Sequence, residues 1–113
     1  MTEIFDLNKL AKFSQKKGKL NLSEDLGAVK KDLMSTRNFG IGLISLEAGQ
    51  EIPPHPEPYG ACFYVVSGKG IFTIGKEQLE LNSGKMVFVA AEEMRGIKSL
   101  ERLVLLGIHD PHV

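Results

Sequence analysis

The sequence predicts an all-β domain preceded by a short N-terminal helix. From residue 28 onward, short segments rich in Val, Ile and Phe recur at a spacing typical of β-sandwiches and barrels. Glycine and asparagine stand between these segments, where turns should fall. The chain has 113 residues, of which 42% are hydrophobic, enough for a single compact core. We therefore expect one domain over 1–113, with a lead over 1–27 and a barrel over 28–110.

The helix is expected over residues 6–17. Asn8 is a candidate N-cap, and Gly18 follows the last periodic position. Lysines occupy one side of this segment, and apolar residues occupy the other at helical spacing: Leu7, Leu10, Ala11 and Phe13.

The strands are expected to be short and separated by tight turns. Turn residues are Asn38, Gly49, Gly68, Gly75 and the Asn82-Ser83-Gly84 triplet. They divide the chain into eight candidate strands: 28–35, 40–47, 61–67, 69–75, 77–81, 86–90, 94–98 and 102–109.

Charge and composition exclude several classes of partner. Fourteen basic and fourteen acidic side chains cancel, so electrostatics do not favour nucleic acid or an anionic membrane surface. No signal peptide and no apolar run of about 20 residues is visible. Cys62 is the sole cysteine, which excludes an internal disulfide. These features predict a cytoplasmic protein.

Two segments resemble the motifs of a known family. The stretch from Gly49 to Gly68 is similar to the first cupin motif, in which His-x-His, a glutamate and a glycine follow an initial glycine at fixed intervals. Gly49, His55 and Gly68 fall in register, while Glu57 stands at the second histidine position and Ala61 at the glutamate position.

The stretch from Gly84 to Ser99 has the length of the second cupin motif. Gly84 matches that motif, and four of its positions are replaced. Proline, glycine, histidine and asparagine of the motif are replaced by Ala90, Glu92, Arg95 and Ser99. With the 15-residue spacer between the motifs, the chain resembles a small single-domain cupin, which implies a jelly-roll-like barrel.

The cupin resemblance implies an interior site at the four motif positions, where relatives hold a divalent transition metal. Here those positions are His55, Glu57, Ala61 and Arg95. His55 and Glu57 can ligate a metal such as Zn, Ni, Fe or Mn, but Ala61 has no donor atom and Arg95 is a permanent cation. No cofactor is therefore favoured. His109 and His112 are expected to be surface residues; the alternative for His109, at the end of the last predicted strand, is a third metal ligand.

Arg95 is expected to replace the metal. Its fork of donors suits a carboxylate, and two partners remain open. Either Glu57 pairs with Arg95 and the two merely fill the barrel mouth, or Arg95 and His55 bind a small anionic ligand such as an organic or sugar acid. Tyr59, on the proline-rich loop, is placed to donate a hydroxyl to the same site.

Alternation along a strand predicts which side chains face the interior. His55, Glu57 and Ala61 are expected on one face with Phe63 and Val65, and Phe88 is expected to line the same pocket. Cys62, Tyr64 and Val66 then face outward. That run is more apolar than a solvated face should be, so we expect a homodimer.

Three function classes are compatible with these residues. The first is a small-molecule-binding cupin without a standard metal centre. The second is a metal-dependent cupin enzyme, such as a dioxygenase, isomerase or decarboxylase, that uses His55 and Glu57. The third is a structural or regulatory module that binds another protein.

Overall fold

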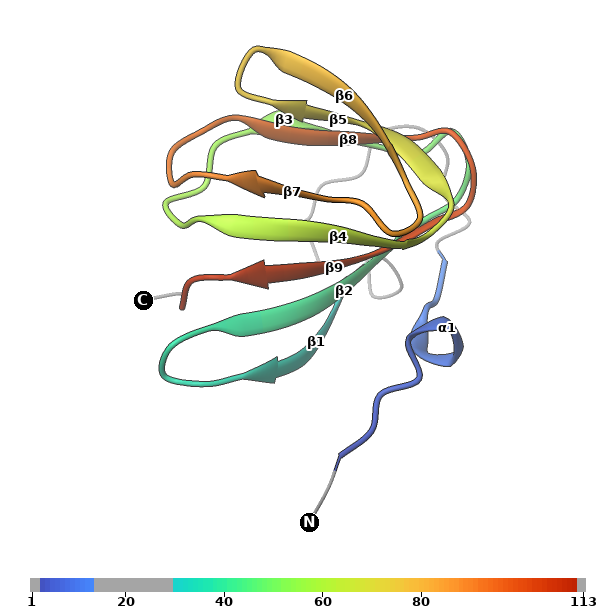
Figure 1. Cartoon of the computed structure of the whole chain (residues 1–113), viewed down its shortest axis with the longest axis vertical. Helices are drawn as coiled ribbons and strands as arrows, with labels where there is room; N and C mark the ends of the chain where they lie inside the picture. Colours follow the sequence, from blue (N-terminus) through green and yellow to red (C-terminus); the bar gives the residue numbers. More distant parts are fainter. Residues whose placement is uncertain (1–2, 14–29, 112–113) are drawn as a thin grey trace.

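The computed structural model describes residues 3–13 and 30–111 and shows two β-sheets packed face to face. One sheet has five strands in the order β1-β2-β9-β4-β7, and the other has four in the order β3-β8-β5-β6. Figure 1 shows the two sheets as layers. The nine strands are β1 (Lys30–Ser35), β2 (Gly40–Leu46), β3 (Glu51–His55), β4 (Ala61–Ser67), β5 (Lys69–Ile74), β6 (Glu77–Asn82), β7 (Met86–Val89), β8 (Arg95–Ser99) and β9 (Leu103–His109).

The predicted all-β fold with a short N-terminal helix is confirmed. The eight predicted strands all occur, and their described ends differ from the prediction by no more than one residue. The predicted turn glycines Gly49, Gly68, Gly75 and Gly84 all have positive φ, between 61° and 90°, a conformation that glycine adopts without steric cost.

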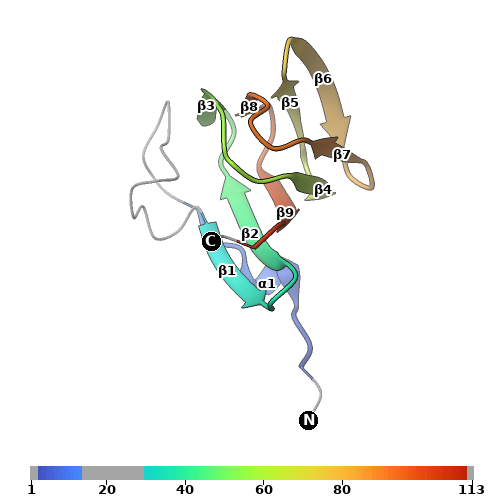
Figure 2. The same ribbon diagram turned by 90° about the vertical axis from the view of Figure 1, so that its left-hand side faces the viewer.

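The helix is much shorter than expected within the described residues. It is a single turn, α1, spanning Leu7–Leu10, and residues 14–17 of the predicted helix lie outside the described part of the chain. The N-cap is Asp6, whose carboxylate accepts a hydrogen bond from the Lys9 amide at 3.3 Å, and not Asn8. The turn lies next to β1 and β2, away from the four-stranded sheet (Figures 1 and 2).

Strand β3 was not predicted. It contains Pro53 and Pro54, which cannot donate hydrogen bonds to a sheet, and it is an edge strand, where proline is tolerated. Its register with β8 shifts between Ile52 and His55. A Cβ atom on Gly96 would lie 2.7 Å from the nitrogen of Pro54, so only glycine allows β8 to approach the prolines this closely.

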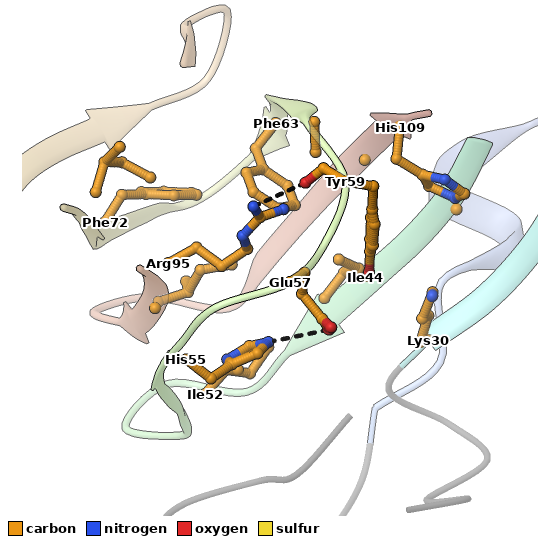
Figure 3. Close-up of a pocket in the computed structure, with 16 residues that line it drawn as sticks. Lys30, Ile44, Ile52, His55, Glu57, Tyr59, Phe63, Phe72, Arg95 and His109 are labelled. Atoms are coloured by element: carbon orange, nitrogen blue, oxygen red, sulfur yellow. Dashed lines mark hydrogen bonds and ion pairs between the residues drawn. The ribbon is translucent and has the colours of Figure 1, made fainter. Parts of the chain in front are cut away.

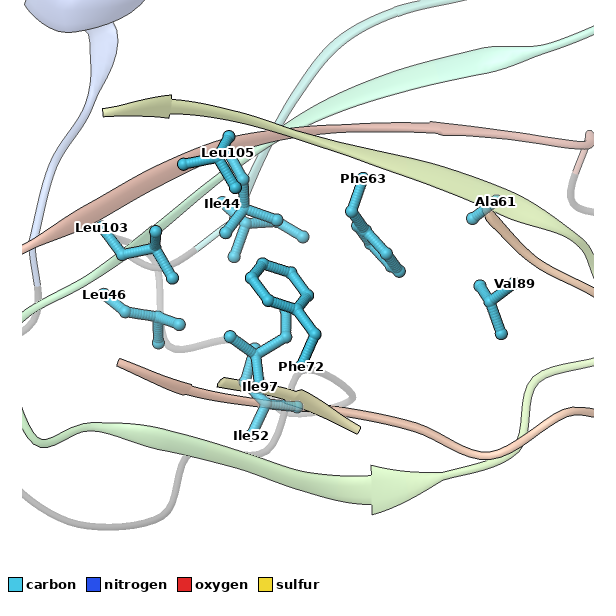
Figure 4. Packing of buried hydrophobic residues seen from close by; sticks show 11 residues of the cluster. Ile44, Leu46, Ile52, Ala61, Phe63, Phe72, Val89, Ile97, Leu103 and Leu105 are labelled. Atoms are coloured by element: carbon cyan, nitrogen blue, oxygen red, sulfur yellow. The ribbon is translucent and has the colours of Figure 1, made fainter. Parts of the chain in front are cut away.

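The core lies between the sheets and is almost wholly apolar. Figure 4 shows Phe72 at its centre, with side chains from both sheets around it. Phe72, Val65 and Leu105 are each 0% exposed. On β4 the predicted alternation holds, because Ala61, Phe63 and Val65 are buried whereas Tyr64 is 37% exposed.

Arg102 anchors the described N-terminal segment to the barrel. Its guanidinium donates to both carboxylate oxygens of Glu47, at 2.8 and 2.9 Å, and lies 4.4 Å from the centre of the Phe13 ring. The hydrogen bonds from Arg102 lower the pKa of Glu47. None of the helices in the described residues is long and apolar enough to span a membrane.

Candidate functional site

A small cavity lies between the sheets, near the end of the barrel where β3 and β9 finish and β4 begins. Its volume is about 50 Å³, close to the space of one or two water molecules. Apolar side chains from both sheets form its floor, and polar side chains form its rim (Figure 3). The rim consists of Lys30, His55, Glu57, Tyr59, Arg95 and His109.

His55, at the end of β3, is held between two acceptors. Its Nδ1 lies 3.0 Å from the carbonyl oxygen of Pro53, and its Nε2 lies 3.3 Å from a carboxylate oxygen of Glu57. A carbonyl can only accept, so Nδ1 must carry a hydrogen. The opposite ring nitrogen, Nε2, then faces the Glu57 side chain, so the carbonyl of Pro53 and the carboxylate of Glu57 together fix the orientation of the imidazole.

Tyr59 approaches the same carboxylate from the loop between β3 and β4. Burial raises the pKa of Tyr59, and the negative charge of Glu57 together with the hydrogen bond between the two side chains raises it further. The raised pKa keeps the hydroxyl protonated through neutral and moderately alkaline pH, so Tyr59 is a donor at this site. Figure 3 shows the Tyr59 side chain between Glu57 and His109.

Arg95, the first residue of β8, connects two loops at the barrel mouth through hydrogen bonds: the loop between β3 and β4 and the loop between β7 and β8. Its Nη2 donates to the carbonyl oxygens of Tyr59 at 2.8 Å and Ala90 at 3.0 Å, and its Nε donates to that of Glu93 at 3.4 Å. Its guanidinium carbon lies 5.4 Å from the centre of the Tyr59 ring. The third nitrogen, Nη1, has no partner among the described residues, so it is the donor left for a ligand.

The charge of Arg95 has no carboxylate counterpart. Only 4% of this residue is exposed, and no carboxylate of the described residues lies within 4.0 Å of it. Glu57 pairs with His55 instead, so of the two partners that the sequence left open for Arg95, Glu57 is not the one found in the structure. Buried charges are usually neutralised by a partner. Carbonyl dipoles solvate this cation, but they do not neutralise it.

His109, at the end of β9, was expected on the surface and instead lines the cavity. Its ring centre lies 5.4 Å from that of Tyr59, and its Nδ1 lies 2.7 Å from the Asp110 carbonyl oxygen. The Tyr59 loop is tied to the same segment, because the Gly60 amide donates to the Asp110 carboxylate at 2.9 Å. His112 lies outside the described residues.

The structure brings most of the predicted site residues together, although not on one strand. His55 ends β3, Glu57 and Tyr59 lie in a loop, and Ala61 and Phe63 belong to the other sheet. All five line the cavity, as Arg95 does.

Two predicted lining residues do not line the cavity. Val65 is buried deeper in the core. Phe88 is 63% exposed and lies opposite Cys62 on the outer face of the five-stranded sheet. Cys62 itself is half-buried on that face. Lys30 was not predicted at the site, because its position on the cavity rim is decided by the pairing of β1 with β2.

The residues present do not fit the metal that the fold implies. Within the described part of the chain, no group of three His, Cys, Asp or Glu side chains is arranged to hold an ion. Ala61 offers no donor atom, and the Arg95 guanidinium occupies the rim and would repel a divalent cation. His55 and Glu57, the two motif residues with donor atoms, interact with each other at 3.3 Å.

Two antiparallel sheets closed over a small, polar-rimmed interior cavity define a jelly-roll-like β-barrel protein. Residues 42–106, more than half of the chain, match the family model of the cupin domain. The chain therefore belongs to the cupin family.

One relative is similar to this chain in sequence. The uncharacterized protein SCO3923 of Streptomyces coelicolor is 34% identical over 55 residues, which cover 49% of this chain and 52% of that protein. The matched segment thus spans about half the length of this curated relative.

Two solved structures extend the likeness to nearly the whole chain. An uncharacterized conserved protein with a double-stranded β-helix domain from Klebsiella pneumoniae has a TM-score of 0.80 at 16% identity, covering 98% of this chain and 91% of the other. The conserved protein SPY1581 of unknown function from Streptococcus pyogenes has a TM-score of 0.74 at 22% identity, covering 100% and 91%. At such identities the likeness establishes the fold alone.

Proposed function

We propose that this protein binds a small organic anion in the mouth of its barrel, without a metal centre. The observation that carries the proposal is the buried, uncompensated charge of Arg95 beside a cavity with an apolar floor. A carboxylate at Nη1 would neutralise the guanidinium through a charge-assisted hydrogen bond. The apolar part of the ligand would then contact Phe63 and Phe72.

Two further rim residues favour an anion over a cation. Lys30 adds a second positive charge to the rim, although it lies 3.8 Å from the Asp32 carboxylate. The nearest acid, Glu57, is occupied by His55 and Tyr59. The volume of about 50 Å³ favours a group of the size of acetate over larger acids.

Acetate is therefore expected to bind saturably, whereas ethylammonium is not. Binding to the folded state alone adds about 2.7 kcal/mol to the free energy of unfolding when the ligand is at 100 times its dissociation constant. Amide shift titrations and denaturant unfolding at constant ionic strength measure both effects. Equal responses to acetate, ethylammonium and chloride would overturn the proposal.

A matched pair of variants locates the binding. Ala61→Leu fills the cavity and is expected to abolish the acetate response, whereas Ala48→Leu places the same side chain in an exposed turn at the other end of the barrel and should preserve it. The fold of each variant is checked by circular dichroism. Unchanged acetate binding by a folded Ala61→Leu variant would place the anion elsewhere.

We also propose that the protein is a homodimer that pairs through the outer face of the five-stranded sheet. Exposed apolar side chains gather there from three neighbouring strands: Tyr64 at 37%, Met86 at 65%, Phe88 at 63% and Ile108 at 40%. Pairing two such faces would remove this apolar surface from water.

Light scattering is expected to give twice the monomer mass at micromolar concentration. Phe88→Lys should shift the protein towards monomer, because it would bury an unpaired charge in the interface. Leu100→Lys, which changes an exposed apolar residue in the turn between β8 and β9, should leave the mass unchanged. A wild-type monomer at these concentrations would contradict the proposed pairing.

A further inference from the structure

A second, larger depression lies outside the cavity, beside the turn of the β1–β2 hairpin. Its volume is about 270 Å³, and polar and apolar groups line it in similar measure. We call it the outer groove. The residues that bear on its chemistry are Asp32, Ser35, Thr36, Phe39 and His109.

His109 is the residue that the cavity and the outer groove share. Its ring packs over Gly40, the residue paired with it across β2 and β9. A Cβ atom on Gly40 would lie 2.8 Å from the His109 Nε2 atom, so the ring occupies this place only because residue 40 is glycine. The ring also lies beside that of Tyr59, at a centroid distance of 5.4 Å. The cavity and the groove thus both border on the His109 side chain.

The ion pair between Lys30 and Asp32 connects the lining of the cavity with that of the outer groove. Lys30 lines the cavity and Asp32 lines the outer groove, and their charged groups lie 3.8 Å apart. A ligand with its carboxylate in the cavity would therefore have a cation beside its head and an acceptor beside its tail.

The groove has the chemistry of a site for hydroxyl groups. The Asp32 carboxylate is 82% exposed and can accept from two neighbouring hydroxyls. Ser35 adds a hydroxyl, and Phe39, 37% exposed, offers a ring face for the C–H side of a polyol chain. The Thr36 hydroxyl is already used in the turn, where it bonds with the backbone of Asn38 and Phe39.

We infer that the outer groove binds the hydroxylated tail of the ligand whose carboxylate lies at Arg95. The ligand class is then a polyhydroxylated carboxylic acid that passes the His109 ring. This inference rests on the proposed function, since the carboxylate of the ligand is held by Arg95 in the inner cavity. The groove would supply contacts to the ligand that acetate is too short to reach.

Three probes separate this inference from the proposal on which it rests. Acetate carries only the carboxylate, hexanoate adds a chain of the same length as gluconate without hydroxyls, and gluconate adds both. We expect gluconate to bind at least about tenfold more tightly than either of the others, which is the effect of about 1.4 kcal/mol of added contacts. Isothermal calorimetry at fixed ionic strength measures all three.

Each outcome decides one point. If acetate binds and gluconate gains nothing over it, the groove inference is wrong and the anion site stands. If hexanoate matches gluconate, the groove recognises apolar length and not hydroxyls, and the inference is again wrong. If none of the three binds, both proposals fail.

A substitution in the groove supplies the last control. Phe39→Ala should remove most of the gluconate advantage, about tenfold, and an acetate titration of the same variant shows whether the inner cavity is intact. Leu100→Ala, an exposed apolar truncation remote from the groove, should retain the advantage. Undiminished gluconate affinity in folded Phe39→Ala would exclude the groove as the tail site.

Discussion

Replacing Phe72 with alanine is expected to lower the free energy of unfolding by about 3–5 kcal/mol, the usual cost of removing a fully buried aromatic side chain. Phe72 is 0% exposed and packs against both sheets, with its ring centre 6.5 Å from that of Phe63. No neighbouring backbone can collapse into the space without moving a strand. Denaturant unfolding followed by circular dichroism measures the loss.

Phe88→Ala is the matched control, because the same side chain is removed from a position that is 63% exposed. Its expected cost is below about 1 kcal/mol in the monomer. Any part of the Phe88 effect that grows with protein concentration would belong to association and not to folding. Similar losses for both variants at low concentration would contradict the placement of Phe88 outside the barrel.

Replacing Arg95 with methionine is expected to lower the free energy of unfolding by about 2–4 kcal/mol, since three backbone carbonyl groups would lose a charged donor that is itself buried. Those carbonyls belong to Tyr59, Ala90 and Glu93, on the two loops that form the barrel mouth. The variant should also lose acetate binding. Urea unfolding and an acetate titration of the folded fraction measure the two effects separately.

The Glu57→Gln variant distinguishes the observed geometry from a Glu57–Arg95 pair. Glu57 interacts with His55 at 3.3 Å and is a third exposed, so its replacement should cost less than about 1 kcal/mol. If Glu57 neutralised Arg95, its loss would strand a buried cation and cost as much as the arginine variant. Equal losses in the two variants would therefore refute the arrangement at the mouth.

Most of the fold was predictable because barrel strands leave strong local signals. Glycine turns and runs of Val, Ile and Phe mark each strand, and the described strand ends agree with the predicted ones to within one residue. The exception is β3, where Pro53 and Pro54 remove backbone donors and so argue against a strand. Only the position of β3 at the sheet edge, a tertiary property, makes those prolines acceptable.

The residues that meet at the mouth of the barrel could be identified from the sequence, but their roles there depend on the tertiary structure. His55, Glu57 and Arg95 were identified from the cupin-like motifs and Tyr59 from its place on the proline-rich loop, and all four line the cavity. Their partners depend on distances of a few ångströms between loops and strands far apart in the sequence, which no local pattern encodes. The same limit explains why Phe88 was wrongly predicted to line the pocket. Its face depends on its register opposite Cys62, and because side chains alternate along a strand, a register shifted by one residue would have turned Phe88 inward.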